Sequence, residues 1–329
     1  VYSERENITP LDIYYLGAYK NIFSGVATVQ DHFPHEMNEE FLPHMPLRVL
    51  SQYALAHECS SFDLGWGKGV KPEHDRAVSE NIPFITHLEE GFDKESQNGV
   101  EILEKADSLD EYAVLIHCIG FSADDIKKAE GAGAHIVWCP ASNMFMFNVT
   151  CKIKEMLDRT VNISIGTDST ASGSYNLFEE MRYARDVYYR MYGENIDPKT
   201  ITNMVTINPA RALRIDEWTG SLEPGKKADI LLLNPSRDDP FDALLEAGSK
   251  DIELLCLEGN PLYGSAEYEE LFTRSGKPFT EITVNGRKKL AVGDPTALME
   301  RVRDAVGFNK TLDFIPIDDR IDDRMVERE

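Results

Sequence analysis

The sequence predicts an α/β protein: a TIM-like (β/α)8 barrel with fewer strands than a complete one, followed by a small β unit. Between residues 26 and 192, short apolar runs alternate with segments of helical period, as they do along a parallel sheet with crossover helices. The runs at 83–87 and 113–117 end on a histidine, and the run at 161–165 leads to Asp168. Because chemistry in such folds gathers at the carboxyl ends of the strands, these polar endings are the first candidates for a site.

Composition narrows the class of protein and of partner. The chain has 329 residues, 42% of them hydrophobic and 28% charged, which is ordinary for a globular protein in water. A formal net charge of −23 argues against nucleic acid and anionic membrane surfaces as partners. The five cysteines are odd in number and lack paired spacing, which predicts reduced thiols and a cytoplasmic protein. No apolar run approaches the roughly 20 residues that span a bilayer.

Hydrophobic period and cap residues predict the elements before residue 218. Ser122 N-caps a helix that has acidic residues in its first turn, and Asn208 with Pro209 opens a short one. Other helices are predicted at 11–24, 72–81, 100–108, 149–159 and 177–192. The strands of the predicted barrel number about six: 26–33, 47–56, 83–87, 113–118, 134–139 and the run that begins at 161.

Past residue 218 the alternation of strand and helix stops. Strands are predicted at 228–234, 252–257 and 282–284, followed by a helix at 295–306 and a charged tail at 316–329. We therefore predict two domains. Residues 1–218 form the barrel part, and residues 219–329 form a C-terminal β unit with a terminal helix and tail.

Histidine and aspartate at the ends of buried strands are the residue types of a metal site. A carboxylate there is costly unless a metal or a cation pairs with it, so Asp168 indicates such a partner. The alternative is that Asp168 caps the helix that follows. Neutral imidazoles and a carboxylate suit a divalent metal ion, zinc above all, with iron or manganese as other candidates.

Motifs spread over much of the chain resemble the amidohydrolase superfamily, in particular its chlorohydrolase and cytosine-deaminase-like aminohydrolase branch. The resemblance runs from about residue 22 to residue 234 in the expected order: HLEE at 87–90, HC at 117–118, CPASN at 139–143, GTDST at 166–170, TINPARAL at 206–213 and GSLEPGKKADILLL at 220–233. It implies a (β/α)8 barrel with a metal at the carboxyl ends of its strands. It also implies a small β-sandwich built from segments on both sides of the barrel.

The resemblance assigns roles to individual residues. It makes His87 and Asp168 metal ligands, and Asp168 also the acceptor of a proton from the attacking water. His117 becomes a further ligand or the group that polarises the scissile bond, and Glu90 becomes a proton shuttle. Taken singly, Glu89 or Glu90 is better explained as a solvated loop carboxylate, and His117 also fits a hydrogen-bonded core histidine. The residues expected to line the substrate pocket are His32, His35, Ser142, Asn143 and Ser169.

The chain departs from the superfamily at one point. The superfamily's first barrel strand carries an H-x-H pair that supplies two metal ligands, and no H-x-H occurs in these 329 residues. We expect the barrel to be incomplete at its N-terminus, with about a hundred residues of a family member absent, and the chain as given to bind metal weakly. Replacement of the missing pair by His32 and His35 is disfavoured. These two are three residues apart across a proline, whereas residues two apart share a strand face.

The resemblance thus implies a metal-dependent hydrolase of carbon–nitrogen bonds other than peptide bonds. The reaction is a deamination, or the opening of a cyclic amide, by a metal-activated water. The expected substrate is a small nitrogen heterocycle or cyclic amide, with neither nucleic acid nor membrane as partner, and we expect a homo-oligomer. The alternative is a catalytically inactive amidohydrolase-like protein with an assembly or regulatory role.

Overall fold

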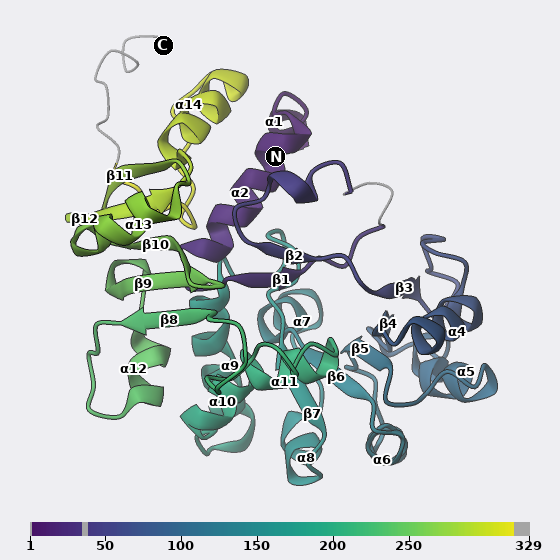
Figure 1. Cartoon of the computed structure of the whole chain (residues 1–329). Coiled ribbons are helices and arrows are strands. Elements are labelled where there is room, and N and C mark those ends of the chain that lie inside the picture. The colour runs from purple at the N-terminus through teal and green to yellow at the C-terminus, as the bar shows by residue number, and fades with distance from the viewer. Residues whose placement is uncertain (1, 35–38, 319–329) are drawn as a thin grey trace. The chain divides into compact units, whose positions relative to one another are not determined.

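The computed structural model describes residues 2–34 and 39–318, which form two compact units (Figure 1). One unit comprises residues 31–34 and 50–226, and the other comprises residues 2–30, 39–49 and 227–318. The second unit therefore includes the N-terminal helix, which the sequence analysis placed with the barrel. Whether the chain folds as two domains with a boundary near residue 218 stays a prediction. His35, expected to line the substrate pocket, lies outside the described residues.

A five-stranded parallel sheet forms the centre of the first unit. Its strands follow one another both along the chain and across the sheet, in the order β3-β4-β5-β6-β7. They are β3 (Ala54–Glu58), β4 (Phe84–Leu88), β5 (Ala113–His117), β6 (His135–Trp138) and β7 (Asn162–Ile165). Every residue of β5 is buried, as the apolar run predicts. Sequential parallel strands joined by helices are the arrangement of a (β/α)8 barrel wall, and the predicted fold class is confirmed.

Among the described residues of this unit, eight helices connect the strands or follow the last of them. They are α4 (Val70–Glu80), α5 (Gly99–Lys105), α6 (Ala123–Ala132), α7 (Pro140–Phe147), α8 (Ile153–Asp158), α9 (Leu177–Tyr192), α10 (Pro198–Met204) and α11 (Ile207–Ala212). Ser122 caps α6 as predicted, because its hydroxyl accepts from the N–H of Asp125, whose carboxylate accepts from the N–H of Ser122. The predicted cap at Asn208 is wrong. Thr206 occupies that position, and the Asn208 amide donates to the Ile163 carbonyl at 2.8 Å.

The segments predicted as strands at 26–33 and 47–56 form shorter strands than expected, and these strands do not all join the parallel sheet. β1 (Thr28–Gln30) and β2 (Arg48–Leu50) form a separate two-stranded sheet, and the parallel sheet begins only with β3. The described backbone after β1 does not pair with another strand, and a tyrosine side chain hydrogen-bonds to it instead. The Tyr53 hydroxyl lies 2.9 Å from the carbonyl oxygen of Asp31 and 2.7 Å from that of Phe33. The chain therefore leaves the extended form after Gln30.

The second unit is built on a five-stranded antiparallel sheet in the order β11-β12-β10-β9-β8, which confirms the predicted small β unit. Its strands are β8 (Ile230–Leu233), β9 (Ile252–Leu257), β10 (Asn260–Ser265), β11 (Phe279–Val284) and β12 (Arg287–Val292). Its α-helices are α1 (Tyr2–Arg5), α2 (Pro10–Ile22), α12 (Pro240–Glu246), α13 (Glu269–Ser275) and α14 (Pro295–Val306). Short 3-10 turns in the two units are η1 (Leu42–His44), η2 (Ser96–Asn98), η3 (Ser249–Asp251) and η4 (Ala266–Tyr268).

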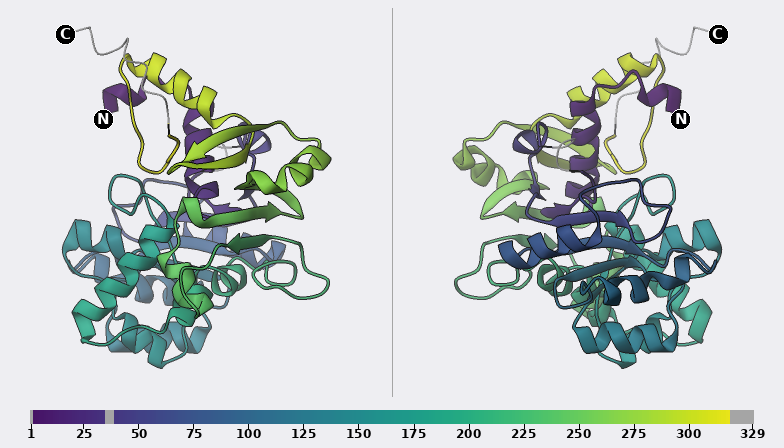
Figure 2. Two further views of the ribbon diagram at one scale, coloured as in Figure 1. Left: turned by 90° about the vertical axis from the view of Figure 1, so that its left-hand side faces the viewer. Right: turned by 90° about the vertical axis from the view of Figure 1, so that its right-hand side faces the viewer.

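Long-range contacts explain why the N-terminal helix α2 belongs to the second unit. It packs against α14 (Figure 2), where the Arg301 guanidinium donates to Oδ1 of Asp12 at 2.6 and 3.0 Å. The Tyr19 hydroxyl donates to the Val292 carbonyl of β12 at 2.8 Å. These hydrogen bonds join residues more than 270 positions apart, which no local sequence pattern reveals.

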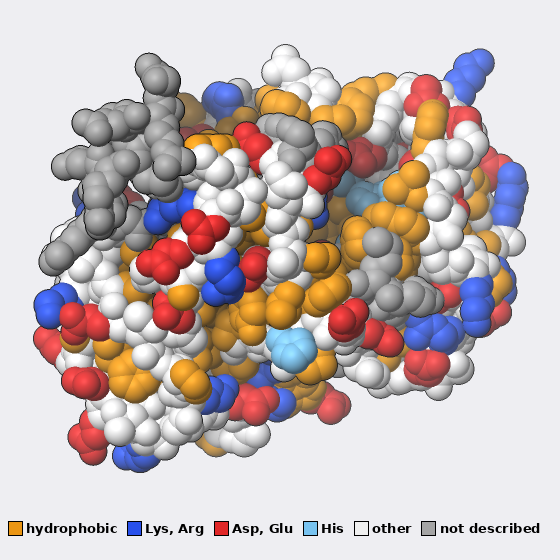
Figure 3. Space-filling model, turned by 90° about the horizontal axis from the view of Figure 1, so that it is seen from above, with side chains coloured by type: hydrophobic (Ala, Val, Ile, Leu, Met, Phe, Trp, Pro, Cys, Tyr) orange, Lys and Arg blue, Asp and Glu red, His pale blue; other side chains and the backbone are white. Residues whose placement is uncertain are grey.

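The surface carries charges of both signs. On the face shown in Figure 3, acidic and basic side chains are interspersed and no large area of one sign is seen. Within residues 2–34 and 39–318, no helix is both long enough and apolar enough to cross a membrane.

Candidate metal centre

The carboxyl edge of the parallel sheet carries the strand-end residues that the sequence singled out. β4 and β5 are paired so that Leu88 lies opposite His117, and Asp168 follows β7 by three residues. Four non-glycine residues adopt a left-handed backbone where the chain leaves these strands: Glu89 (φ 51°), His117 (φ 72°), Cys118 (φ 51°) and Asp168 (φ 51°). Such conformations are costly for residues with a Cβ and cluster at functional sites. This edge is therefore the candidate site.

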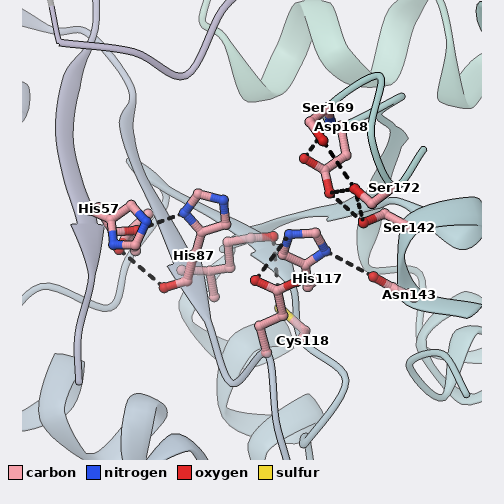
Figure 4. Close-up of polar contacts among 12 residues, drawn as sticks. His57, His87, His117, Cys118, Ser142, Asn143, Asp168, Ser169 and Ser172 are labelled. Carbon is pink, nitrogen blue, oxygen red and sulfur yellow. Dashed lines mark hydrogen bonds and ion pairs between the residues drawn. The ribbon is translucent and has the colours of Figure 1, made fainter. Parts of the chain in front are cut away.

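His87, Glu90 and His117 form a group that could hold a metal ion. One ligand atom from each lies within 4.8 Å of the others. The two imidazole rings stack with centroids 5.3 Å apart (Figure 4), and Nε2 of His117 lies 3.5 Å from Oε2 of Glu90. Two imidazoles and a carboxylate fit zinc. Glu90 occupies the third place in this group, where the resemblance implied Asp168, so a ligand role for Asp168 stays a prediction.

Hydrogen bonds decide which nitrogen of each imidazole is available. Nδ1 of His87 lies 2.7 Å from the carbonyl oxygen of His57, which can only accept, so Nδ1 carries the proton and Nε2 keeps its lone pair. Nδ1 of His117 lies 2.8 Å from Oδ1 of Asn143. Asn143, expected to contact substrate, is fully buried and binds His117 in this structure. Burial, together with His117, lowers the pKa of His87 to about 4, which favours the neutral form that metals bind.

The Asp168 carboxylate is held by serines, two of which were expected to contact substrate. The Ser142 hydroxyl donates to Oδ2, the Ser172 hydroxyl donates to the same oxygen at 3.3 Å, and the Ser169 N–H donates to Oδ1 at 2.6 Å (Figure 4). Burial by itself raises the pKa of Asp168. The hydrogen bond from Ser142 and the nearby His117 outweigh burial and hold that pKa below its ordinary value. The carboxylate is therefore ionised at neutral pH.

Two adjacent glutamates follow β4 and differ in their surroundings. Glu89 is almost fully buried, its Oε1 accepts from the Val100 N–H at 3.1 Å, and burial raises its pKa to about 7. Burial also raises the pKa of Glu90, an effect that His117 opposes. Glu90 is the one of the pair that contacts a site histidine, as the HLEE motif implied.

Glu180 supports the site, and nothing in its sequence neighbourhood distinguishes it from exposed acidic residues. It is fully buried in the first turn of α9, and its two carboxylate oxygens accept from the N–H groups of Ala141 at 3.0 Å and Ser174 at 3.1 Å. It therefore joins the start of α7 to the loop that follows Asp168. The N-cap of α9 is Asn176, so the alternative in which Asp168 caps the next helix is wrong.

Aromatic rings surround His87. The His32 ring lies edge-on to it with centroids 4.8 Å apart, and the His57 ring lies 5.1 Å from His87 and 4.8 Å from Trp66. Both ring nitrogens of His32 are buried without a hydrogen-bond partner among the described residues, and burial with the neighbouring histidines lowers its pKa to about 3. The sequence analysis missed His57, although ALAH at 54–57 repeats the pattern of an apolar run that ends on histidine.

Known proteins share this sequence and fold in part. A model described as the amidohydrolase family matches residues 77–267, more than half of the chain. A 5-methylthioadenosine/S-adenosylhomocysteine deaminase of Acetivibrio thermocellus is 28% identical over 200 residues, which are 57% of this chain and 46% of the relative. An S-triazine hydrolase of Gordonia rubripertincta is 30% identical over 206 residues, which are 59% of this chain and 43% of the relative. The chain thus spans about half the length of such relatives, or less.

Solved structures share the fold more completely. The crystal structure of an adenosine deaminase from Xanthomonas campestris with bound zinc matches with a TM-score of 0.70 at 17% identity, over 92% of this chain and 77% of that chain. This likeness agrees with the parallel sheet and the C-terminal antiparallel sheet described above. With a family match across more than half of its residues, this chain belongs to the amidohydrolase family.

Proposed function

We propose that this protein is a metal-dependent hydrolase of carbon–nitrogen bonds other than peptide bonds, acting on a small nitrogen heterocycle or cyclic amide. The observation that carries the proposal is the convergence of His87, Glu90 and His117 within 4.8 Å at the carboxyl edge of the parallel sheet. The names of two relatives support the substrate class, because 5-methylthioadenosine and S-triazine both contain nitrogen-rich rings.

The donor set indicates how an ion would be held. His87 and His117 would bind it through ring nitrogens, and Glu90 or Asp168 would add an oxygen. A divalent ion, zinc in the first place and iron or manganese otherwise, supplies Lewis acidity and lowers the pKa of a bound water to about 7.

Two carboxyl groups divide the proton transfers. In this proposal Asp168 accepts a proton from the attacking water, a role supported by its ionised carboxylate, which accepts from Ser142 at Oδ2. Glu90 holds a proton and delivers it to the departing nitrogen, a role supported by its position 3.5 Å from Nε2 of His117. His117, whose Nδ1 faces Oδ1 of Asn143, keeps an unprotonated Nε2, which is the nitrogen that would bind the ion.

We assign the substrate side of the site to His32, together with Ser142 and Ser169, and keep His35 as a predicted member. His32 offers a neutral ring whose two nitrogens have no hydrogen-bond partner among the described residues, which suits recognition of a polar heterocycle. We also infer a cytoplasmic location, which the five free cysteines support. The homo-oligomeric state stays a prediction.

Ammonia release tests the proposal. The full-length protein, supplied with zinc, is assayed with 5-methylthioadenosine, S-adenosylhomocysteine, cytosine and an amino-substituted triazine, and ring opening of a cyclic amide is followed by ultraviolet absorbance. We expect turnover that a chelator abolishes, zinc restores and Asp168→Asn lacks. The alternative is the catalytically inactive protein. It would be favoured by no turnover on any substrate together with less than roughly a tenth of an equivalent of metal per chain, because an assembled site holds its ion tightly.

A further inference from the structure

A chain of buried hydrogen bonds leads away from His117 through Nδ1, the ring nitrogen that Glu90 does not contact. Nδ1 lies 2.8 Å from Oδ1 of Asn143, whose Nδ2 donates to Oγ1 of Thr150 at 2.9 Å. Nε1 of Trp138 donates to the same Thr150 oxygen at 2.7 Å. The exposed fractions from His117 to Trp138 are 1%, 0%, 3% and 0%. Figure 4 shows the His117 ring between His87 on one side and Asn143 on the other.

The order of protons along this chain follows from the orientation of the Asn143 amide. Its Nδ2 donates to Oγ1 of Thr150, which also accepts from the indole N–H of Trp138. The other end of the amide, Oδ1, faces His117. Because an amide oxygen can only accept, the proton between Asn143 and His117 belongs to Nδ1. Nε2 of His117 is then unprotonated and lies 3.5 Å from Oε2 of Glu90.

We propose that Asn143 is a positioning residue that holds His117 as the Nδ1–H tautomer and keeps Nε2 free for the reactive side of the site. Asn143 acts through His117 and does not itself reach the reacting atoms, while Thr150 and Trp138 hold its amide in the required orientation. This role takes the place of the substrate contact expected from the sequence. The inference rests on the proposed function only in taking the Nε2 side as reactive.

Four variants separate this role from simple packing. Asn143→Leu removes the acceptor at similar volume, and Asn143→Asp keeps an oxygen for the Nδ1 proton. Thr150→Val removes the oxygen that orients the amide, and Thr150→Ser, which keeps that oxygen, is its matched control. If Asn143→Leu fails to fold, the pair at Thr150 still decides the question, because both leave Asn143 in place.

The first readout is the tautomer of His117 in the metal-free, full-length protein. Long-range proton–nitrogen NMR spectra of protein labelled with nitrogen-15 histidine distinguish the two tautomers, and His117→Gln assigns the signal. We expect the proton on Nδ1 in the parent, in Asn143→Asp and in Thr150→Ser. In Asn143→Leu and Thr150→Val we expect a mixture of tautomers, or the proton on Nε2. A proton on Nε2 in the parent, as a reversed amide would give, overturns the proposal.

The second readout is the affinity of the chelator-treated protein for zinc alone. Residues that hydrogen-bond a metal-binding histidine typically change metal affinity by about 10–100-fold, so Asn143→Leu should weaken zinc binding by that factor and Asn143→Asp should not. A parent-like tautomer and parent-like affinity in Asn143→Leu would also overturn the proposal. Neither readout depends on turnover. A protein that is inactive yet shows the Nδ1–H tautomer and this pattern of zinc affinities overturns the proposed function and supports the positioning role.

Discussion

Replacing Glu180 by glutamine should destabilise the folded protein through the loss of one buried hydrogen bond. Each oxygen of the fully buried Glu180 carboxylate accepts a backbone N–H, from Ala141 at 3.0 Å and from Ser174 at 3.1 Å. Glutamine keeps one acceptor oxygen but turns an NH2 group toward the other N–H, so two donors face each other. A hydrogen bond to a charged group is worth about 1.5–3 kcal/mol, and we expect Glu180→Gln to lower the free energy of unfolding by that amount.

Urea unfolding, followed by tryptophan fluorescence and far-ultraviolet circular dichroism, measures this change. Glu179→Gln is the matched control in the same helical turn. The Glu179 side chain is half exposed and pairs with Arg182 at 2.6 Å, an interaction worth about 0.2–1 kcal/mol at a surface. A cost for Glu180→Gln no larger than that for Glu179→Gln would refute the role of Glu180 as the link between α7 and the loop after β7.

Three further substitutions test other parts of the molecule. Gly173→Ala should lower turnover without unfolding the chain, because a Cβ there would lie 1.7 Å from the Thr167 carbonyl oxygen and must displace the loop after β7. Circular dichroism and ammonia release on one preparation check this. If Asp168 supplies the oxygen ligand and Glu90 carries the proton, Glu90→Gln should keep the bound metal and slow turnover by about 10²–10⁴-fold, which elemental analysis and kinetics together measure. Asp12→Asn should lower the free energy of unfolding at pH 7 by about 0.5–1 kcal/mol. Burial by itself raises the pKa of Asp12, but hydrogen bonds, first of all from Arg301, hold it below its ordinary value. The stabilisation is therefore complete above the unfolded-state pKa of about 4 and is lost as the pH falls through the folded-state pKa. Urea unfolding at pH 7 and about pH 3 should show the difference shrinking in acid.

Local patterns were sufficient where the stabilising partner is close in sequence. The run that forms β5 is apolar up to His117 because it is buried on both faces, and the Ser122 cap was predictable because its partner is three residues away. Asn208 has an equally good local pattern for a cap. Its amide instead binds the carbonyl of Ile163, 45 residues away, and this contact determines its role.

Two strands whose composition is unusual for a strand were missed. β10 contains a proline and a glycine, and β12 begins with three basic residues, so neither resembles a strand in isolation. Lys289 of β12 is almost fully buried, because its Nζ donates to the Ile252 carbonyl at 2.6 Å on β9. Partners of this kind become visible only once the sheet has formed.

In the candidate site too, residues with a local sequence signal were predicted, and residues that depend on distant partners were not. His87 and His117 were found because each ends an apolar run, and His57 escaped only because the predicted strand at 47–56 stopped one residue before it. Glu180 and Thr150 carry no local signal. Their roles depend on burial and on backbone and side-chain groups that folding brings to them from other elements.

Zinc titration of the metal-free, full-length protein tests most directly whether the residues at the strand ends form a metal centre. Isothermal titration calorimetry should show one zinc ion bound per chain. His87→Ala should weaken that binding by at least about 100-fold, more than the loss of a residue that only orients a ligand. His44→Ala, at an exposed histidine of η1, is the control and should bind as the parent does. A parent protein that binds no zinc, or a His87→Ala variant that binds it as tightly as the parent, would contradict the metal centre proposed for His87, Glu90 and His117.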